Sequence, residues 1–135
     1  MTAVLVDSNV ILDIATADPV WYDWSSEALT RCADEAYLAI NIIYAEVSIG
    51  FERIEELEET LVPVFFRRLP LPYEAGFLAG KCYRIYRRSG GEKRSPLPDF
   101  YIGAHAAVSR VKLLTRDAKR YRSYFPTIEL IAPDA

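Results

Sequence analysis

The sequence predicts a single α/β domain in which a parallel sheet of about four or five strands is covered by helices on both faces. The length of 135 residues fits one domain with its own hydrophobic core. Short apolar runs, typical of buried strands, alternate with longer amphipathic segments, typical of helices. Strands separated by helices favour parallel pairing, and residues 1–135 contain no repeat, low-complexity tract or domain linker.

The predicted strands are short and mostly apolar. The first, Ala3–Val6, is a continuous apolar run, as expected of a parallel strand buried on both faces. Pro72 limits the third, because proline cannot donate a hydrogen bond to a neighbouring strand. In chain order the predicted strands are Ala3–Val6, Tyr37–Ile40, Arg67–Leu71, Val111–Thr115 and Ile128–Ile131.

Helix-starting and helix-ending residues mark the segments between these strands. Asp7–Asn9 offers three good starting residues before an amphipathic segment. Pro63 can end a Glu-rich helix early, and Gly90-Gly91 follows the longest helix. The predicted helices are Val10–Ala15, Tyr22–Asp34, Ile42–Gly50 capped by Asn41, Arg53–Phe66, Tyr73–Arg88, Asp99–Arg110 and Asp117–Tyr124.

The composition is that of a folded soluble protein, with 51% hydrophobic and 26% charged residues. Met1–Val6 lacks the pattern of a signal peptide, and Tyr37–Ala45 is too short to span a bilayer. Cys32 and Cys82 form no Cys-x-x-Cys pair and accompany a single histidine, so neither a zinc site nor a disulfide scaffold is expected. The sequence therefore predicts a cytoplasmic protein without membrane association. Any metal it binds would have oxygen ligands, which points to Mg²⁺ or Mn²⁺.

The net charge of −3 conceals a strong polarity along the chain. Residues 1–59 carry 13 acidic and 2 basic residues, a net of −11, whereas residues 60–135 carry 6 acidic and 14 basic residues, a net of +8. Two interpretations are open. The second half contains a surface for nucleic acid or another partner, or solvated helix faces differ in sign by chance.

Glu46 lies in the middle of an apolar helix face. At 3.6 residues per turn, Ile42, Ile43 and Ile49 fall within about 60° of it. An unpaired ionised carboxylate in such surroundings is strongly unfavourable. Glu46 therefore requires a metal cation, a buried arginine or lysine, or a proton, and the sequence leaves these alternatives open.

Three aspartates stand where predicted helices begin. Asp7 and Asp117 follow predicted strands and Asp99 follows Pro98, and each could be a helix N-cap. Asp7 and Asp117 also lie beyond the carboxyl ends of parallel strands, where open α/β sheets bind their ligands. If these ends meet, the aspartates and Glu46 repel one another, and a divalent cation would turn that repulsion into binding energy.

Four short segments, spread in order over nearly the whole chain, carry a family resemblance. They are Val4–Asp13 (VLVDSNVILD), Ala45-Glu46, Pro98–Ala104 (PDFYIGA) and Leu113–Asp117 (LLTRD). Together they resemble the PIN-domain ribonucleases, and at this chain length most resemble the VapC toxins of bacterial and archaeal toxin–antitoxin pairs. The resemblance implies a single PIN-like domain over residues 1–135.

The resemblance also implies an acidic site for one or two Mg²⁺ or Mn²⁺ ions, with the ligands Asp7, Glu46, Asp99 and Asp117. Asn9 and Thr115 match positions that orient these carboxylates or a bound water. Asp13 matches as well, with a surface position on its helix as the alternative. Gly103 stands where such families often carry alanine, and nothing essential is expected to depend on this difference.

A cation held mainly by Asp7 and Asp99 is expected to lower the pKa of a bound water and to neutralise the phosphate. Hydrolysis of an RNA phosphodiester would then leave a 5′-phosphate and a 3′-hydroxyl, without a Lys, Ser or His nucleophile. His105 lies six residues after Asp99, about 240° around the helix, and is not expected at the site.

Basic residues gather before Asp99 and around Thr115. They are predicted to contact the RNA backbone through sequence-independent charge, with solvated helix ends as the alternative. These candidates are Lys81, Arg84, Arg87, Arg88, Lys93, Arg94 and Arg116, and the basic group after Thr115 also includes Lys119, Arg120 and Arg122. The aromatic segment Trp21–Trp24 belongs either to the core or to an apolar groove. The resemblance implies a cognate antitoxin that occupies such a groove, and a homodimer.

Two other classes of function remain open. A haloacid-dehalogenase phosphatase requires a second aspartate two residues after Asp7, where Asn9 stands. A phospho-receiver requires a lysine at a late strand end, which Thr115–Asp117 does not supply. A non-catalytic PIN-like binding module would keep only the fold, and the presence of all four acids argues against it.

Overall fold

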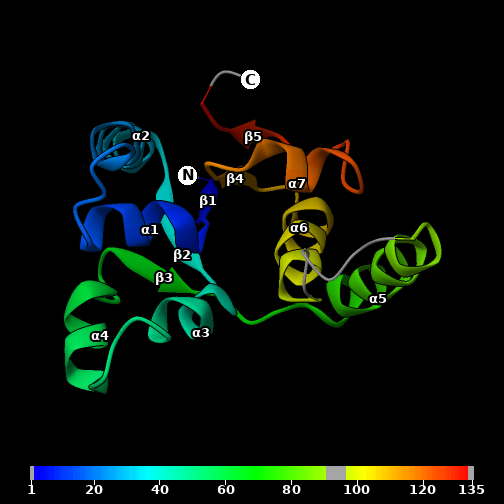
Figure 1. Ribbon diagram of the computed structural model, residues 1–135, viewed down its shortest axis with the longest axis horizontal. Coiled ribbons are helices and arrows are strands. Elements are labelled where there is room, and N and C mark those ends of the chain that lie inside the picture. The colour runs from blue at the N-terminus through cyan, green and yellow to red at the C-terminus, as the bar shows by residue number, and fades with distance from the viewer. Residues whose placement is uncertain (1, 91–96, 134–135) are drawn as a thin grey trace.

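A computed structural model describes residues 2–90 and 97–133 and shows a single α/β domain (Figure 1). The described residues form one five-stranded sheet in the order β3-β2-β1-β4-β5, and every pair of neighbours is parallel. The predicted fold class is therefore confirmed. The strands are β1 Ala3–Val6, β2 Tyr37–Ile40, β3 Phe66–Arg68, β4 Lys112–Leu114 and β5 Leu130–Ile131.

Helices cover both faces of this sheet. In Figure 1, α1 and α2 lie on one side of β1 and α6 lies on the other, with α5 outside α6. This arrangement follows from right-handed crossovers, because the chain moves from β1 outwards to β3 and then returns to β4 on the opposite side of β1. The helices are α1 Ser8–Ala15, α2 Tyr22–Glu35, α3 Ile43–Ser48, α4 Ile54–Thr60, α5 Tyr73–Arg88, α6 Leu97–Ser109 and α7 Ala118–Arg122.

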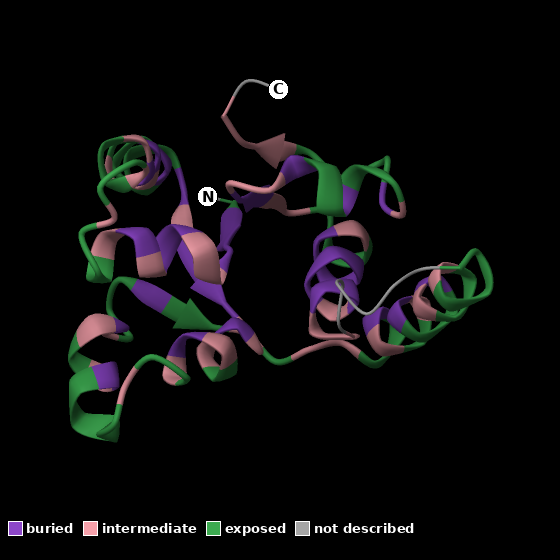
Figure 2. Cartoon of the chain, in the orientation of Figure 1, coloured by how far each residue is buried: buried purple, intermediate pink, exposed green. Residues whose placement is uncertain are grey.

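The central strand β1 explains the continuous apolar run at the start of the chain. All four of its residues are buried, because β2 and β4 flank it and helices cover both of its faces. Figure 2 shows the buried residues concentrated in β1, β2 and α6, whereas α4 and the outer side of α5 are exposed. The core thus surrounds the strand that ends just before Asp7.

Element boundaries differ from the sequence predictions where proline or a short loop intervenes. The Glu-rich helix ends at Thr60 rather than continuing to Phe66, because Pro63 cannot donate a helical hydrogen bond. The third strand is Phe66–Arg68 rather than Arg67–Leu71. The sixth helix begins at Leu97, two residues before Asp99, with Pro98 in its first turn, where a missing N–H costs nothing.

The aromatic segment near the start of α2 divides between the core and the surface. Trp24 packs against the core, and Trp21 meets it edge-on with ring centroids 6.2 Å apart. Tyr22 is 42% exposed. Cys32 and Cys82 are buried free thiols, in agreement with the sequence. No helix in residues 2–90 or 97–133 is both long enough and apolar enough to cross a membrane.

Gly103 allows α6 to approach the ring of Phe125. A Cβ atom at this position would lie 2.4 Å from Cδ2 of Phe125 and 2.5 Å from Cε2, far inside contact distance. Phe125 is itself 4% exposed and surrounded by core, so its ring has little room to move. The expectation that nothing depends on Gly103 was therefore wrong.

We expect Gly103→Ala to lower the free energy of unfolding by about 1 to 3 kcal/mol, the usual result of overpacking a filled core. Gly80→Ala is the matched control, because Gly80 lies within α5 with nothing near its missing Cβ. The control should gain about 0.5 to 1 kcal/mol from helix propensity alone. Urea unfolding of both variants measures the difference, and equal gains in stability would contradict the packing argument.

Candidate acidic site at the carboxyl edge of the sheet

The pairing of β1 with β4 brings two of the predicted aspartates to one edge of the sheet. Val6 is in register with Leu114, and the backbone N–H of Asp7 donates to the Leu114 carbonyl at 2.9 Å. Asp7 therefore follows β1 at the same edge at which Asp117 follows β4. Asp7 is also the N-cap of α1, because its Oδ1 accepts a hydrogen bond from Ser8 N at 2.8 Å.

Asp7 is 3% exposed and its carboxylate is held by three hydrogen bonds. Besides the bond from Ser8, Oδ2 accepts from Thr115 Oγ1 at 2.8 Å and from the Tyr121 hydroxyl at 2.9 Å. Burial raises the pKa of Asp7, and these hydrogen bonds oppose the rise. Burial and the nearby Asp7 also raise the pKa of Tyr121, so its hydroxyl keeps the proton that it donates.

Tyr121 is a site residue that the sequence reasoning missed. Its side chain is fully buried on α7, a helix of only five residues, which is too short for a hydrophobic pattern to reveal an inward-facing hydroxyl. Its position four residues after Asp117, about one helical turn, was the only available signal.

Thr115 and Asn9 link the ends of β1 and β4 through a chain of hydrogen bonds. Thr115 Oγ1 donates to Asp7 and accepts from Asp117 N at 3.1 Å and from Asn9 Nδ2 at 3.4 Å. Asn9 Oδ1 in turn accepts from Arg116 N at 3.1 Å. Thr115 thus contacts a predicted ligand directly, whereas Asn9 acts one step further away, on Thr115 and the backbone of Arg116.

Glu46 reaches the same edge from α3, and only a hydrogen bond with Ser8 and the more distant charge of Arg120 favour its ionised form. Its Oε1 is buried without a hydrogen-bond partner, and no basic side chain in the described ranges forms an ion pair with it. Burial raises the pKa of Glu46 to about 7, and the charges of Asp7 and Asp99 add to the rise. The buried ion pair that the sequence left open is therefore absent from the described part of the chain.

Asp99 is 4% exposed and meets the guanidinium of Arg120. Arg120 Nη1 lies 3.3 Å from Asp99 Oδ2, although this oxygen accepts no well-aligned hydrogen bond. Arg120 Nε lies 3.2 Å from Asp117 Oδ2. Burial raises the pKa of Asp99 to about 6; Arg120 opposes this rise, and the charges of Asp7 and Asp117 add to it. The four predicted acids are thus linked electrostatically, with Arg120 between two of them.

The site has the chemistry of a Mg²⁺ or Mn²⁺ site but not a closed set of ligands. Within the described ranges, no three Asp, Glu, His or Cys side chains are arranged to hold one ion. Magnesium, however, is usually bound through one or two carboxylates and completed by water. Glu46 Oε1 and Asp99 Oδ2, both buried and without a hydrogen bond, are oxygen donors of this kind. The residues present therefore fit a hydrated divalent cation.

Asp13 is not a surface residue, which corrects the alternative considered for it. It is 3% exposed and accepts hydrogen bonds from Arg116 Nε and Nη2, both at 2.9 Å, and from Ser25 Oγ at 2.7 Å. The Arg116 guanidinium also lies 5.3 Å from the centre of a Trp21 ring. Because its guanidinium is engaged by Asp13, Arg116 is less free to contact RNA than the other basic candidates.

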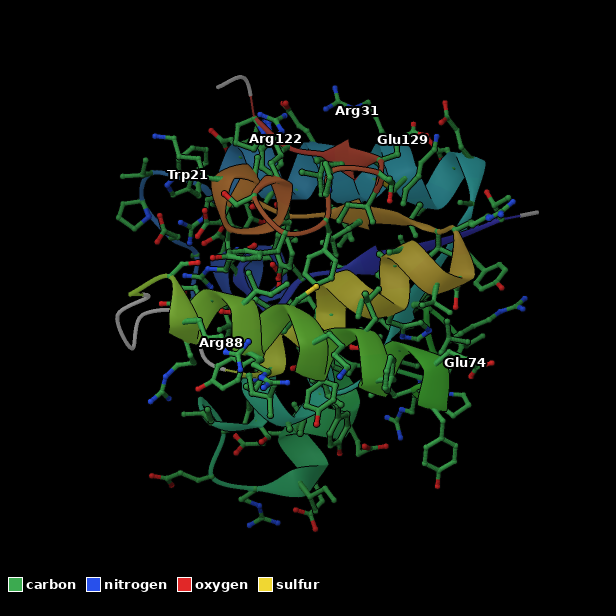
Figure 3. All side chains as sticks on the ribbon, turned by 90° about the vertical axis from the view of Figure 1, so that its right-hand side faces the viewer. Trp21, Arg31, Glu74, Arg88, Arg122 and Glu129 are labelled. Atoms are coloured by element: carbon green, nitrogen blue, oxygen red, sulfur yellow. The ribbon has the colours of Figure 1, made fainter. Side chains whose placement is uncertain are left out.

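The other basic candidates remain on the surface of α5. The rings of Tyr83 and Tyr86 pack on Phe100, the neighbour of Asp99, with centroids 5.4 Å apart in each case. The C-terminal half of α5 therefore lies against the start of α6. In Figure 3, Arg88 and Glu74 lie at opposite ends of α5. The exposed candidates are Lys81, Arg84, Arg87 and Arg88, whereas Lys93 and Arg94 lie outside the described residues.

His105 has a partner away from the acids. It is 2% exposed, and its Nδ1 lies 2.8 Å from Nδ2 of Asn41. Asn41 Oδ1 accepts from Ile43 N, the first residue of α3, at 3.1 Å, although the N-cap position is Ile42 and not the predicted Asn41. Burial lowers the pKa of His105, and the neutral ring can accept the hydrogen bond from Asn41.

Fold and site together define an α/β domain with a buried acidic centre at the carboxyl ends of its parallel strands. A model of the PIN domain family matches residues 4–125, which is most of the chain. The chain belongs to the PIN domain family. No curated protein sequence matches it.

Several solved structures share this fold. One is a chain in the structure of VapBC2 from Rickettsia felis bound to a DNA fragment from the VapBC2 promoter. It is 19% identical, with a TM-score of 0.74 over 98% of this chain and 100% of that chain. A chain of FitAcB from Neisseria gonorrhoeae is 21% identical, with a TM-score of 0.68 over 95% and 96%. A chain of a toxin–antitoxin complex from Klebsiella pneumoniae is 22% identical, with a TM-score of 0.66 over 87% and 89%.

Because Glu46 has no ion-pair partner in the described residues, its raised pKa predicts how its replacement by glutamine changes the stability of the protein. Between pH 4.5 and about 7 the unfolded chain loses the Glu46 proton while the folded protein retains it, so stability falls as the pH rises through this window. We expect Glu46→Gln to be as stable as the wild type near pH 4.5 and more stable at pH 8 without metal, by about 1 to 3 kcal/mol.

Chemical unfolding in EDTA across this pH range measures the effect. Glu27→Gln, an exposed glutamate on α2, is the control and should show no comparable gain. A large loss of stability in Glu46→Gln at pH 8 would mean that Glu46 belongs to a structural ion pair.

Proposed function

We propose that the chain is a metal-dependent endoribonuclease and the toxin of a toxin–antitoxin pair. The observation that carries this proposal is the pair of buried carboxylate oxygens without a hydrogen bond, Glu46 Oε1 and Asp99 Oδ2, at the carboxyl edge of a PIN domain. Oxygens of this kind stabilise a folded protein only when a cation or a proton joins them. The likeness to chains of VapBC, FitAcB and toxin–antitoxin structures supports the toxin assignment.

The residues of the site divide into cation holders and supports. Asp99 and Glu46, together with Asp7 and Asp117, would hold one or two Mg²⁺ or Mn²⁺ ions, directly or through water. Such an ion, when bound, lowers the pKa of a water molecule and neutralises the phosphate charge. Thr115 and Tyr121 fix the orientation of the Asp7 carboxylate by donating to its Oδ2. Asn9 in turn holds Thr115 in place.

The substrate side of the proposal rests on the exposed bases of α5. Arg87 and Arg88 follow Tyr86, whose ring packs on Phe100, the residue after Asp99, so these exposed bases extend from the end of α5 that lies against the start of α6. We assign Lys81, Arg84, Arg87 and Arg88, with Lys93 and Arg94 from the adjoining segment, to the RNA backbone. A cognate antitoxin, a homodimer and a cytoplasmic location complete the proposal.

Cleavage of RNA by the purified protein tests the proposal. The protein should cut RNA in the presence of Mn²⁺ or Mg²⁺ and should stop when EDTA is added, and Glu46→Gln should lose activity by orders of magnitude. A generic phosphate ester is assayed in parallel. Turnover of the ester without RNA cleavage would favour a phosphatase, and inertness towards both substrates would favour a binding module.

Metal binding should be visible in stability as well as in cleavage. A saturating cation at 100 times its Kd adds about 2.7 kcal/mol to the free energy of unfolding. We expect Asp99→Asn to fold and to lose most of this gain, because it removes a buried ligand oxygen. Asp34→Asn, the same change on the exposed end of α2, should retain the gain. Thermal unfolding with and without Mn²⁺ measures both, and an unchanged response in Asp99→Asn would exclude this site.

RNA affinity should fall steeply with salt if the α5 bases contact phosphates. Each lost contact with single-stranded RNA flattens the plot of log K against log salt by about 0.7. Arg87→Ala combined with Arg88→Ala should therefore flatten it by roughly 1.4 in EDTA, where no cleavage is expected. Arg31→Ala combined with Arg110→Ala removes the same charge from exposed positions on α2 and just before β4. Equal slopes in the two double variants would show that α5 does not contact the RNA.

A further inference from the structure

Arg120 is the basic residue that contacts the acidic site. Its Nη1 lies 3.3 Å from Asp99 Oδ2 and its Nε lies 3.2 Å from Asp117 Oδ2. Within residues 2–90 and 97–133, no other lysine or arginine forms an ion pair with any of the four acids. The guanidinium fork therefore bridges an acid from α6 and an acid from the end of β4.

This bridge does not neutralise the site. One positive charge faces four carboxylates, and Glu46 Oε1 remains buried without a partner. Asp99 Oδ2 has the Arg120 charge nearby but no well-aligned hydrogen bond. The contact is therefore a charge contact of modest geometry rather than the bidentate pairing that makes arginine–carboxylate bridges strong.

Arg120 is also able to leave. Its side chain is 35% exposed, and its partner Asp117 is 40% exposed, so the guanidinium can exchange the two carboxylates for water by rotation of its own stem. Asp99, at 4% exposure, cannot move in this way. The mobile partner of the pair is the arginine.

We propose that Arg120 is an internal counter-ion of the acidic site, which a divalent cation must displace from Asp99 in order to bind. The inference rests on the proposed metal-dependent function. The cation and Arg120 require the same oxygen, Asp99 Oδ2, so binding of one excludes the other. Arg120 stabilises the protein without metal and lowers its affinity for metal, which makes it a determinant of the cation concentration at which the site fills.

Direct binding of Mn²⁺ tests the competition without any activity assay. Free Mn²⁺ is counted by electron paramagnetic resonance at fixed ionic strength for the wild type, Arg120→Ala and Arg122→Ala. Arg122 is the matched control, because it is an exposed arginine on the same helix without a role in the site. We expect Arg120→Ala to bind Mn²⁺ about tenfold more tightly than the wild type and to melt at a lower temperature in EDTA. Arg122→Ala should change the Kd less than twofold.

An unchanged or weaker Kd in folded Arg120→Ala would overturn the inference while leaving the metal site intact. Undetectable Mn²⁺ binding to the wild type at millimolar concentration would defeat the proposed function, and the inference with it. A gain of similar size in Arg122→Ala would show that net charge, not competition at Asp99, sets the affinity.

A measurement on the wild type covers the case in which Arg120→Ala does not fold. The Nε–H signal of Arg120 in a ¹⁵N NMR spectrum is assigned by its loss in Arg120→Lys. Titration with Mg²⁺ should shift this signal towards that of a solvent-exposed arginine, with the same midpoint as metal binding. A signal that stays in place while Mg²⁺ binds would contradict displacement.

Discussion

The parallel pairing of β1 with β4 is the constraint on which the acidic site depends. It fixes Asp7 and Asp117 at one edge of the sheet, through the register of Val6 with Leu114 and the hydrogen bond from Asp7 N to the Leu114 carbonyl. The strands are buried on both faces, so a shift of register would expose core side chains and is strongly disfavoured. Hydrophobic burial thus holds together carboxylates that would otherwise separate.

The buried acids of this site therefore lower the stability of the folded chain. Burial raises the pKa of Asp7, Glu46 and Asp99, which shows that the folded chain resists ionising all of them. Two neighbouring residues of α7 relieve the conflict in different ways. Tyr121 supplies a hydrogen bond to Asp7, and Arg120 supplies a charge to Asp99. Neither residue donates a hydrogen bond to Glu46 Oε1, which remains buried without a hydrogen-bond partner.

Sequence reasoning found the parts of this site that local patterns encode. Strand ends and helix starts located Asp7 and Asp117, and the helical period placed Glu46 on an apolar face, because these signals lie within a few residues of one another. Arg120 was predicted only as a member of the basic group after Thr115, and Tyr121 escaped it altogether, because α7 has only five residues and shows no period. The fit of Gly103 against Phe125 escaped it as well, since contacts between distant segments depend on tertiary packing. The helix end at Thr60, by contrast, follows from Pro63, a local signal that the sequence shows.

The two arginines beside Asp117 show why a charge must be weighed against its partners. Arg116 and Arg120 are exposed to a similar extent, at 31% and 35%, and lie four residues apart. Arg116 forms a bidentate pair with one buried acid, Asp13. The two charges largely neutralise each other, so the pair attracts a third charged group only weakly. Arg120 meets two acids of a larger cluster that remains negative.

The pairing of Asp13 with Arg116 also accounts for part of the charge polarity of the chain, since it joins the acidic first half to the basic second half inside the fold. Within residues 2–90 and 97–133 the exposed bases of α5 form no ion pair, so the part of the charge polarity that is available to an external partner lies with them.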